Sequence, residues 1–177
     1  TDVMPQANGS NPGYSAYDSD VAKCQIQDVK ANGSDVVIVY FHFGNEYSRS
    51  PNPDQEKMAH EVIDYGADAV LGSHPHVTQG IEMYKGKPIF YSLGNFIFDM
   101  SNSATHIACI VKIDFVNDTG ECTVYPVIIS GYLPYFMGPD EGTSLLNSLS
   151  PPCDDLEITP EGTGKLYFNL TGDTNES

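Results

Sequence analysis

The chain has 177 residues, with 24 acidic and 8 basic side chains and a net charge of −16. Its length fits one domain, or part of one, that buries about two thirds of its unfolded surface. So acidic a chain lacks the basic patches that bind phosphate backbones, and anionic membrane surfaces are also disfavoured. We therefore expect no nucleic-acid partner. No apolar stretch approaches the roughly 18 to 20 residues that span a bilayer.

The first third of the chain predicts a loop, a helix and a strand. Residues 1–17 are rich in Gly, Asn, Pro and Ser without periodicity, which indicates a loop-rich start. Residues 18–31 begin with N-cap chemistry and predict a helix. The apolar stripe of that helix would consist of Val21, Cys24 and Val29. Residues 36–41 are a continuous β-branched and aromatic run, typical of a strand covered on both faces.

A parallel crossover unit is predicted next. A helix over residues 54–65 has acidic residues in its first turn and Gly66 as its stop. Residues 67–71 follow as a strand, and strand, helix and strand with short loops form a parallel unit. Residues 81–84 and 89–93 then predict an antiparallel pair.

The last third predicts antiparallel structure. Residues 106–116 and 121–129 read as a hairpin joined by residues 117–120, and a short helix and a strand follow at 144–150 and 165–170. In this register Cys122 would face Phe115. Cys109 would then lie about 20 Å along the strand from Cys122, beyond disulfide reach. We expect Cys109 to be a buried apolar thiol.

Histidines follow both predicted parallel strands. His42 comes directly after residues 36–41, and Gly72–His76 reads Gly-Ser-His-Pro-His after residues 67–71. Because ligands of α/β sheets bind at the carboxyl ends of parallel strands, we expect His42, His74 and His76 to converge. Neutral imidazole is the commonest nitrogen ligand of transition metals. The pattern favours metal or phosphate chemistry over ordinary polar loop residues.

Other polar residues carry weaker signals. Glu46 follows His42 by four residues and either orients a ligand histidine or is a solvated loop carboxylate. Gln79 and Asn95 are polar residues at apolar turns; Asn95 either caps a turn, the favoured role, or donates to a bound anion. His60 lies mid-helix and is expected to be solvated near acidic neighbours. No nucleophile–base arrangement or phosphate-binding loop is present in the sequence.

Linked motifs occur in order over about residues 35–99. Residues 35–47 resemble a D-V-V-I-V…H-W-G-x-E-Y segment, and residues 53–55 and 63–68 look like P-x-x-Q, with one residue fewer between Pro and Gln, and L-I-D-x-G-A-D. Residues 72–80 resemble G-x-H-P-H-V-x-Q-G, and residues 91–99 resemble Y-S-L-G-N-F-x-F-D. Together these motifs resemble the CapA family of poly-γ-glutamate capsule biosynthesis proteins.

The resemblance implies a fold and a site. The fold would be α/β, part of a calcineurin-like metallophosphatase sandwich with a parallel crossover unit followed by antiparallel strands. Divalent metal ions would be bound by His42, His74 and His76, and the candidate catalytic residues are His76, Glu46 and Asn95. Family members usually lie outside the cytoplasm, tethered to the membrane by a segment that this chain lacks.

The sequence departs from the family in its first half. The early Gly-Asp, Asn-x-Glu and Asn-His motifs are missing, and only about 40 residues separate Asp2 from His42. We therefore expect residues 1–177 to form the C-terminal part of a larger CapA-like domain, with Thr1–Met4 a later strand end. Without the usual carboxylates, which bridge paired metals, such a part should be inactive alone.

Two functions remain open at this point. One is a capsule or exopolymer biosynthesis protein with a metallophosphatase-like metal site. The alternative is a non-enzymatic scaffold or polymer-handling component of a membrane synthase complex. In either case the capsule synthase complex is the expected partner. Exposed strand edges would also favour pairing with a second copy of the chain.

Overall fold

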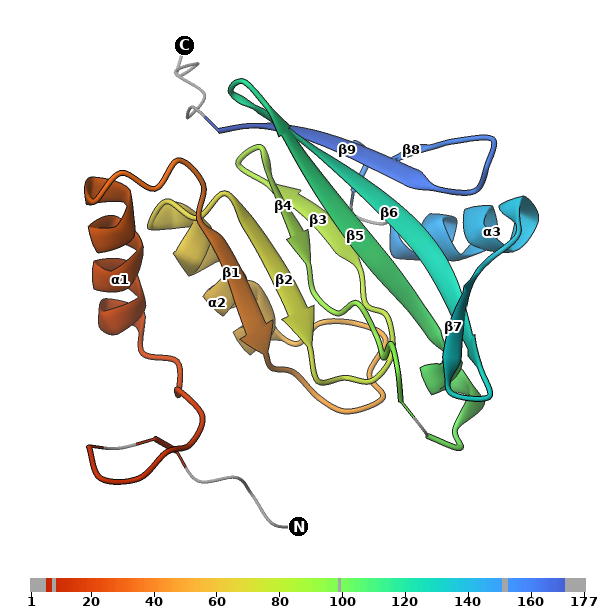
Figure 1. Ribbon diagram of the computed structural model, residues 1–177, viewed down its shortest axis with the longest axis horizontal. Helices are drawn as coiled ribbons and strands as arrows, with labels where there is room; N and C mark the ends of the chain where they lie inside the picture. Colours follow the sequence, from red (N-terminus) through yellow and green to blue (C-terminus); the bar gives the residue numbers. More distant parts are fainter. Residues whose placement is uncertain (1–5, 8, 99, 151–152, 171–177) are drawn as a thin grey trace.

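The computed structural model describes residues 6–7, 9–98, 100–150 and 153–170, and shows a mixed α/β fold built on two sheets (Figure 1). The prediction for Thr1–Met4 lies outside these residues. The helices are α1 (Ser19–Ala31), α2 (Pro53–Asp64), α3 (Pro139–Leu149) and the 3₁₀ turn η1 (Ser103–His106). The strands are β1 (Ile38–His42), β2 (Ala69–Ser73), β3 (Ile81–Tyr84), β4 (Lys87–Phe90), β5 (Ile107–Val116), β6 (Thr119–Ser130), β7 (Leu133–Phe136), β8 (Glu157–Ile158) and β9 (Gly164–Asn169).

The first sheet contains the predicted parallel unit. Its strand order is β1-β2-β4-β3, with β1, β2 and β4 parallel and β3 antiparallel to β4. The register sets Ile38 opposite Ala69 and His42 opposite Ser73. This arrangement confirms the parallel crossover and the antiparallel pair that follows it. It also puts the carboxyl ends of three strands at one edge.

The second sheet is antiparallel, in the order β5-β6-β9-β8 with β7 beside β6. Its β5–β6 hairpin is confirmed, but the predicted register is wrong: Cys122 lies opposite Ile113, and Phe115 lies opposite Gly120. The turn is shorter than expected because Asn117, at φ 54°, adopts the left-handed conformation of a tight hairpin turn. Cys109 is a buried free thiol as predicted, and burial raises its pKa to about 12.

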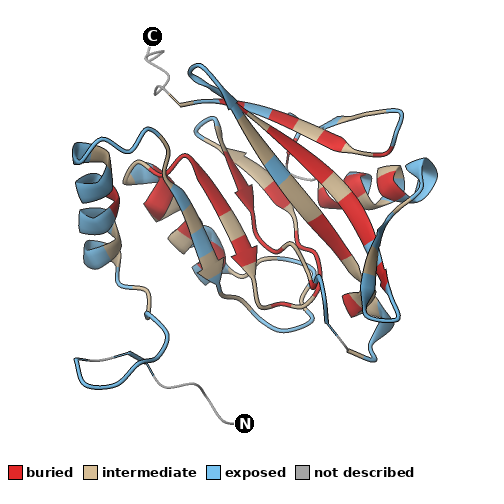
Figure 2. Ribbon diagram, viewed as in Figure 1, coloured by how far each residue is buried: buried red, intermediate tan, exposed pale blue. Residues whose placement is uncertain are grey.

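Two apolar cores cover opposite faces of the first sheet (Figure 2). On one face Val70 and Ile89 pack with α1 and α2 through Ile26, Ala59, Val62 and Ile63. On the other face the second sheet and α3 share a core with the first sheet. That core includes Phe90, Cys109, Cys122, Val124, Leu146, Leu149, Leu166 and Phe168. The first sheet is therefore the middle layer of the fold.

The predicted burial of the apolar stripe of α1 and of both faces of β1 is wrong. In α1 only Ile26 is buried, while Cys24 is exposed and Val21 and Val29 are 51% and 42% exposed. The helix packs against α2, and most of its residues are exposed (Figure 2). Strand β1, an edge strand, is not covered on both faces either, because Ile38, Tyr40 and His42 share one of its faces and are all exposed.

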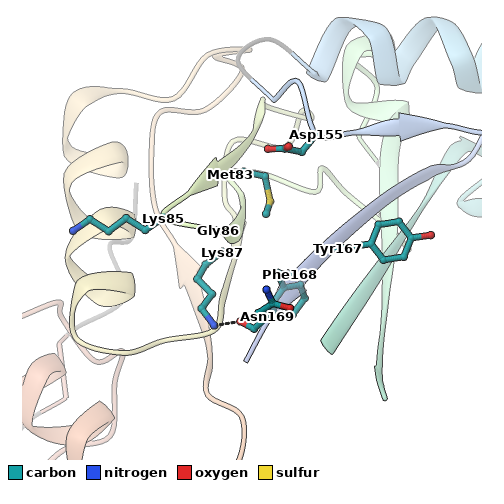
Figure 3. A pocket seen from close by; sticks show the side chains of 8 residues that line it. All are labelled: Met83, Lys85, Gly86, Lys87, Asp155, Tyr167, Phe168 and Asn169. Carbon is teal, nitrogen blue, oxygen red and sulfur yellow. Dashed lines mark hydrogen bonds between the residues drawn. The ribbon is translucent and has the colours of Figure 1, made fainter. Parts of the chain in front are cut away.

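A buried carboxylate fixes the opposite end of the parallel strands. Asp68, which is fully buried, accepts a hydrogen bond from the Val37 backbone N–H at 3.0 Å. It also pairs with Lys30 at 3.1 Å and with Lys87 at 2.9 Å. Lys87 in turn donates to the carbonyl of Asn169, which links β4 to β9 in the second sheet (Figure 3). One side chain therefore connects α1, β1, β2 and β4.

Replacing this carboxylate should destabilise the whole fold. Asp68→Ala leaves Lys87 and the Val37 N–H without their buried acceptor, so the free energy of unfolding should fall by about 3 kcal/mol or more. Urea denaturation followed by circular dichroism measures the change. The matched control is Asp114→Ala, which breaks an exposed pair with Lys112 and should cost less than about 1 kcal/mol. Equal losses in the two variants would contradict the assignment.

Candidate functional site

Three parallel strands deliver polar side chains to one edge of the first sheet. β1 ends on His42, β2 leads directly into His74 and His76, and the segment after β4 carries Asn95. At Gly72 the backbone of β2 approaches the backbone at Tyr91 closely, which brings the strand ends together. A Cβ atom there would lie 2.1 Å from the Tyr91 carbonyl oxygen, so only glycine fits at this position of β2. The predicted convergence at the strand ends is thus a property of the fold.

His42 and His74 form a contacting pair. The Nε2 atom of His42 lies 3.1 Å from Nδ1 of His74, and the ring centroids are 4.7 Å apart. Ser73 lies 3.1 Å from Nδ1 of His42 and donates its hydroxyl proton to the Phe41 carbonyl at 3.4 Å. The serine oxygen therefore accepts from the N–H at Nδ1 of His42. This tautomer leaves a lone pair on Nε2 of His42.

His76 is oriented by an amide. Its Nδ1 lies 2.8 Å from Oδ1 of Asn95, while Nδ2 of Asn95 donates to the Thr105 carbonyl at 3.3 Å. Because the amide nitrogen is engaged, the oxygen must accept, and Nδ1 of His76 carries the proton. The lone pair of His76 then lies on Nε2. Asn95 thus positions a histidine, a role that the sequence alone did not indicate.

The local environment favours neutral imidazole. Burial lowers the pKa of His42 below its ordinary value, and the positive charges of His74 and His76, when protonated, lower it further. A lowered pKa keeps His42 unprotonated at neutral pH. By linkage, this group stabilises the fold above its ordinary pKa, and the contribution is lost as pH falls toward the folded-state value. Neutral imidazole is also the form that binds metal ions.

The arrangement of the histidines fits part of a metal site. With bonds of about 2.0–2.1 Å, two nitrogen ligands of a tetrahedral ion lie about 3.3 Å apart, close to the separation in the His42–His74 pair. In the metal-free pair Nδ1 of His74 donates its proton to Nε2 of His42, and a bound ion would take the place of that proton. The ring of His76 lies 6.2 Å from that of His74. Across the described residues, no group of three or more His, Cys, Asp or Glu side chains is arranged to hold one ion. The three imidazoles therefore form one contacting pair, His42 and His74, with His76 nearby but outside that pair.

Two other candidates lie apart from the cluster. Glu46 is exposed and has no hydrogen bond or ion pair with any described residue, so no histidine is oriented by it. His60 is not simply solvated, contrary to expectation. Its ring stacks on Tyr84 with centroids 3.8 Å apart, and Nε2 lies 2.9 Å from a carboxylate oxygen of Glu82. Strand β3 thus packs against the face of α2 that carries His60. The sequence of the helix alone could not indicate this tertiary contact.

The backbone is strained at this site. Tyr47, His74 and His76 have positive φ angles of 64°, 100° and 62°, three of the six non-glycine residues with positive φ in the described chain. Such conformations cost about 1–3 kcal/mol each and persist only where the surroundings hold them. Strain of this kind clusters at functional sites. These residues lie on the loop after β1 and on residues 74–76, the histidine loop, so the strain supports a functional role for both loops.

An amide relay, made of Asn52 and the buried side chains of Gln55 and Gln79, connects the loop after β1 to the segment that follows the histidines. The Asn52 N–H donates to Oε1 of Gln55 at 3.1 Å, and Nε2 of Gln55 donates to Oε1 of Gln79 at 2.9 Å. Gln79 then donates to the carbonyls of Ser48 and Ser50 at 2.9 and 3.0 Å. Sequence analysis missed this relay, although both glutamines lie in the linked motifs.

Glycine makes room for the relay. Gly44 has φ 97°, and a Cβ atom there would lie 2.4 Å from Oε1 of Gln55. The loop after β1 can therefore close over the glutamine. Tyr47 completes the attachment, because its N–H donates to the Pro75 carbonyl at 2.8 Å and its ring stacks on His76 with centroids 6.1 Å apart. The loop after β1 is thus fixed to the histidine loop.

A groove extends from the histidine pair along β1. Its volume is about 1080 Å³, and it runs between β1 and α1. Its walls are largely aromatic and aliphatic. The residues lining it include Tyr14, Tyr17, Val39, Tyr40, Phe41, Phe43, His42 and His74. The histidine pair is therefore accessible to a ligand from this side.

Backbone strain at His74 can be measured with a pair of variants. His74→Gly and His74→Ala both remove the imidazole, but only glycine relieves the positive φ. We expect His74→Gly to be the more stable variant by about 1 kcal/mol, measured by thermal and urea denaturation without added metal. At ordinary positions alanine is the more stable of the two. Higher stability of His74→Ala would show that the loop is not strained.

Comparison with known proteins assigns the chain to a family. The family model described as "Bacterial capsule synthesis protein PGA_cap" matches residues 2–100, a range that contains the histidine cluster, Glu46 and Asn95. The PGA biosynthesis protein CapA of Bacillus subtilis (strain 168) is 38% identical over 129 residues, which cover 72% of this chain and 34% of that protein.

Two further relatives match shorter stretches. The capsule biosynthesis protein CapA of Bacillus anthracis is 41% identical over 109 residues, covering 60% of this chain and 26% of that protein. A probable polyglutamine synthesis accessory protein of Mycobacterium tuberculosis is 34% identical over 87 residues, covering 49% and 22%. The chain thus spans at most about a third of the length of these relatives. With more than half of its residues matched by the family model, the chain belongs to the bacterial capsule synthesis protein family, as its motifs predict.

Proposed function

We propose that this chain carries the histidine part of a divalent-metal site in a protein of capsule-polymer synthesis. The observation that carries the proposal is the His42–His74 contact, in which two imidazole nitrogens lie 3.1 Å apart at the carboxyl ends of two parallel strands. The relatives named for capsule or PGA biosynthesis supply the process. Bound to the pair, a divalent ion would polarise a phosphoryl or carbonyl oxygen, or activate a water molecule.

Each polar residue of the cluster has a distinct part in this proposal. His42 and His74 bind the ion. His76 presents Nε2, because its Nδ1 donates to Asn95, and this free nitrogen accepts or returns a proton at the substrate or binds a second ion. Asn95 keeps His76 in that tautomer. Glu46 is proposed to orient a histidine by rotation of its exposed side chain toward the cluster, while its loop stays in place.

The described residues supply imidazoles but no carboxylate at the cluster. Paired metal ions need bridging anions, so the remaining ligands would come from residues outside the described chain or from the substrate. We therefore propose that this chain alone is inactive and that the complete site belongs to a larger, calcineurin-like domain. The mixed sheet, with helices on one face and a second sheet on the other, supports this architecture.

We further propose a place at the cell surface, where capsule is assembled, and a partnership with a membrane synthase complex. The name of the mycobacterial relative, a synthesis accessory protein, supports a role beside such machinery. In the described residues, no helix is long and apolar enough to cross a bilayer. The open edge of β1, with Tyr40 exposed, is where a second copy would pair.

The alternative is a scaffold that handles polymer without catalysis. The lack of a three-ligand group among the described residues and the exposure of Glu46 favour it. The two functions differ in what the histidines are needed for. A scaffold would retain its activity without them, whereas a metal enzyme would not.

Metal binding tests the proposed site directly. We expect Mn²⁺ or Zn²⁺ to bind the purified protein in isothermal titration, and His42→Ala or His74→Ala to weaken binding about tenfold or more, because each removes one of two adjacent ligands. His60→Ala is the matched control, since it removes an imidazole that stacks on Tyr84 away from the cluster. Equal affinity in His74→Ala and His60→Ala would exclude the site.

Capsule formation separates the enzyme from the scaffold. In a strain whose own gene is deleted, the gene carrying His74→Ala should fail to restore capsule, while the gene carrying His60→Ala should restore it. Capsular polymer is measured by extraction and gel analysis, with protein level checked by immunoblot. Full restoration by His74→Ala at normal protein level would favour the scaffold.

A further inference from the structure

Arg49 differs from the other basic residues of this acidic chain. Six lysines lie within 4 Å of a carboxylate oxygen, and Lys23 lies over the ring of Tyr65 at 5.7 Å. Arg49 has no hydrogen-bonded, ionic or aromatic partner among the residues that the structure describes. Its guanidinium is therefore exposed and available to a ligand.

The backbone on both sides of Arg49 is fixed. The side-chain amide of Gln79, which is 1% exposed, donates to the carbonyls of Ser48 and Ser50. Ser48 also donates its hydroxyl to the Ser50 carbonyl at 2.8 Å. The buried Gln79 amide is thus hydrogen-bonded to the residues directly before and after Arg49. Holding a binding residue in place before the ligand arrives reduces the entropy that binding must overcome.

The fixed loop lies against the histidine cluster. Tyr47, two residues before Arg49, donates its N–H to the Pro75 carbonyl and stacks on His76. Two residues span at most about 7 Å, so the Cα atom of Arg49 lies within that distance of the Cα atom of Tyr47. The pocket that contains Lys85 and Lys87 offers no equivalent unpaired cation. In the pocket of Figure 3, Lys85 is paired with Asp64 and Lys87 with Asp68.

The net charge of the chain suggests why an arginine lies beside the histidine cluster. At a net charge of −16, the chain repels anions in general, so a cationic side chain beside the site would favour the binding of an anionic substrate. Arginine binds carboxylate and phosphate oxygens through two parallel hydrogen bonds. We propose that Arg49 binds an oxyanion of the substrate, a carboxylate or a phosphate group, beside the histidine cluster. This inference rests on the proposed function for what happens to that substrate.

Anion titration tests the inference. Inorganic phosphate and, separately, a γ-linked glutamate oligomer are titrated into the protein with and without Mn²⁺, and the tighter ligand identifies the source of the oxyanion. We expect Arg49→Gln to weaken binding about tenfold or more, and Arg49→Lys to lose less, because it keeps the charge but not the paired donors. Lys112→Gln removes the same charge from β5, in the other sheet, and should leave binding unchanged.

The outcomes separate this inference from the proposed function. Equal affinity of Arg49→Gln and the unsubstituted protein, with and without Mn²⁺, would overturn the role of Arg49, and so would the absence of anion binding to the unsubstituted protein. Failure of Mn²⁺ to bind would overturn the metal site, yet the metal-free titrations would still decide the role of Arg49. Arg49→Gln should keep its metal affinity and melting temperature, because the side chain is exposed and forms no hydrogen bond, ion pair or ring contact with a described residue.

Discussion

The register of the three parallel strands is the constraint on which the site depends. β1, β2 and β4 pair so that His42 lies opposite Ser73 and the loops of His74, His76 and Asn95 open at the same edge. Successive side chains of a strand point to opposite faces of the sheet. If one strand shifted its pairing register by one residue, all of its side chains would move to the opposite face. Asp68 secures the register at one end of the strands, and the close approach at Gly72 secures it near the other.

The site combines strained loops with a rigid support. His74 and His76 have backbone conformations that a free chain avoids, and they keep them because their neighbours leave no alternative. The support is polar and buried: Asn95 holds His76, and the amide relay holds the loop after β1. Every member of these networks has its hydrogen-bond partners, which is the condition under which buried polar groups rigidify a protein. The histidine cluster is therefore organised before any ligand binds.

Much of the fold could be predicted because its signals are local. The β-branched run before His42 and the glycine that ends α2 specify a strand and a helix through their own propensities. The position of α3 was predicted too late in the chain, since Pro139 at its first turn, after Gly138, is itself a start signal. The hairpin register failed because Asn117 and Asp118 alone form the turn. Strand β8 has two residues and leaves almost no pattern.

The site was predictable only in part. Strand-end histidines stand out in a sequence, so it was predictable that His42, His74 and His76 follow neighbouring strands at one edge of the sheet. Burial of β1 was misjudged because a continuous apolar run is equally compatible with the middle and the edge of a sheet. The hydrogen bonds from Gln55 to Gln79 and between Asn95 and His76 join residues 24 and 19 positions apart, and no local pattern records such pairs. The linked motifs marked these residues without giving their roles.

Gln55 joins the folding of α2 to the geometry of the site. Its backbone and side chain form the capping box with Asn52 that begins the helix, and the same side chain binds Gln79. Fraying of the first turn of α2 would therefore release the loop that carries Arg49 in the same event. Proteins open in cooperative units, and shared hydrogen bonds define their limits. The helix start and the loop should accordingly belong to one such unit, with backbone amides that exchange with solvent together.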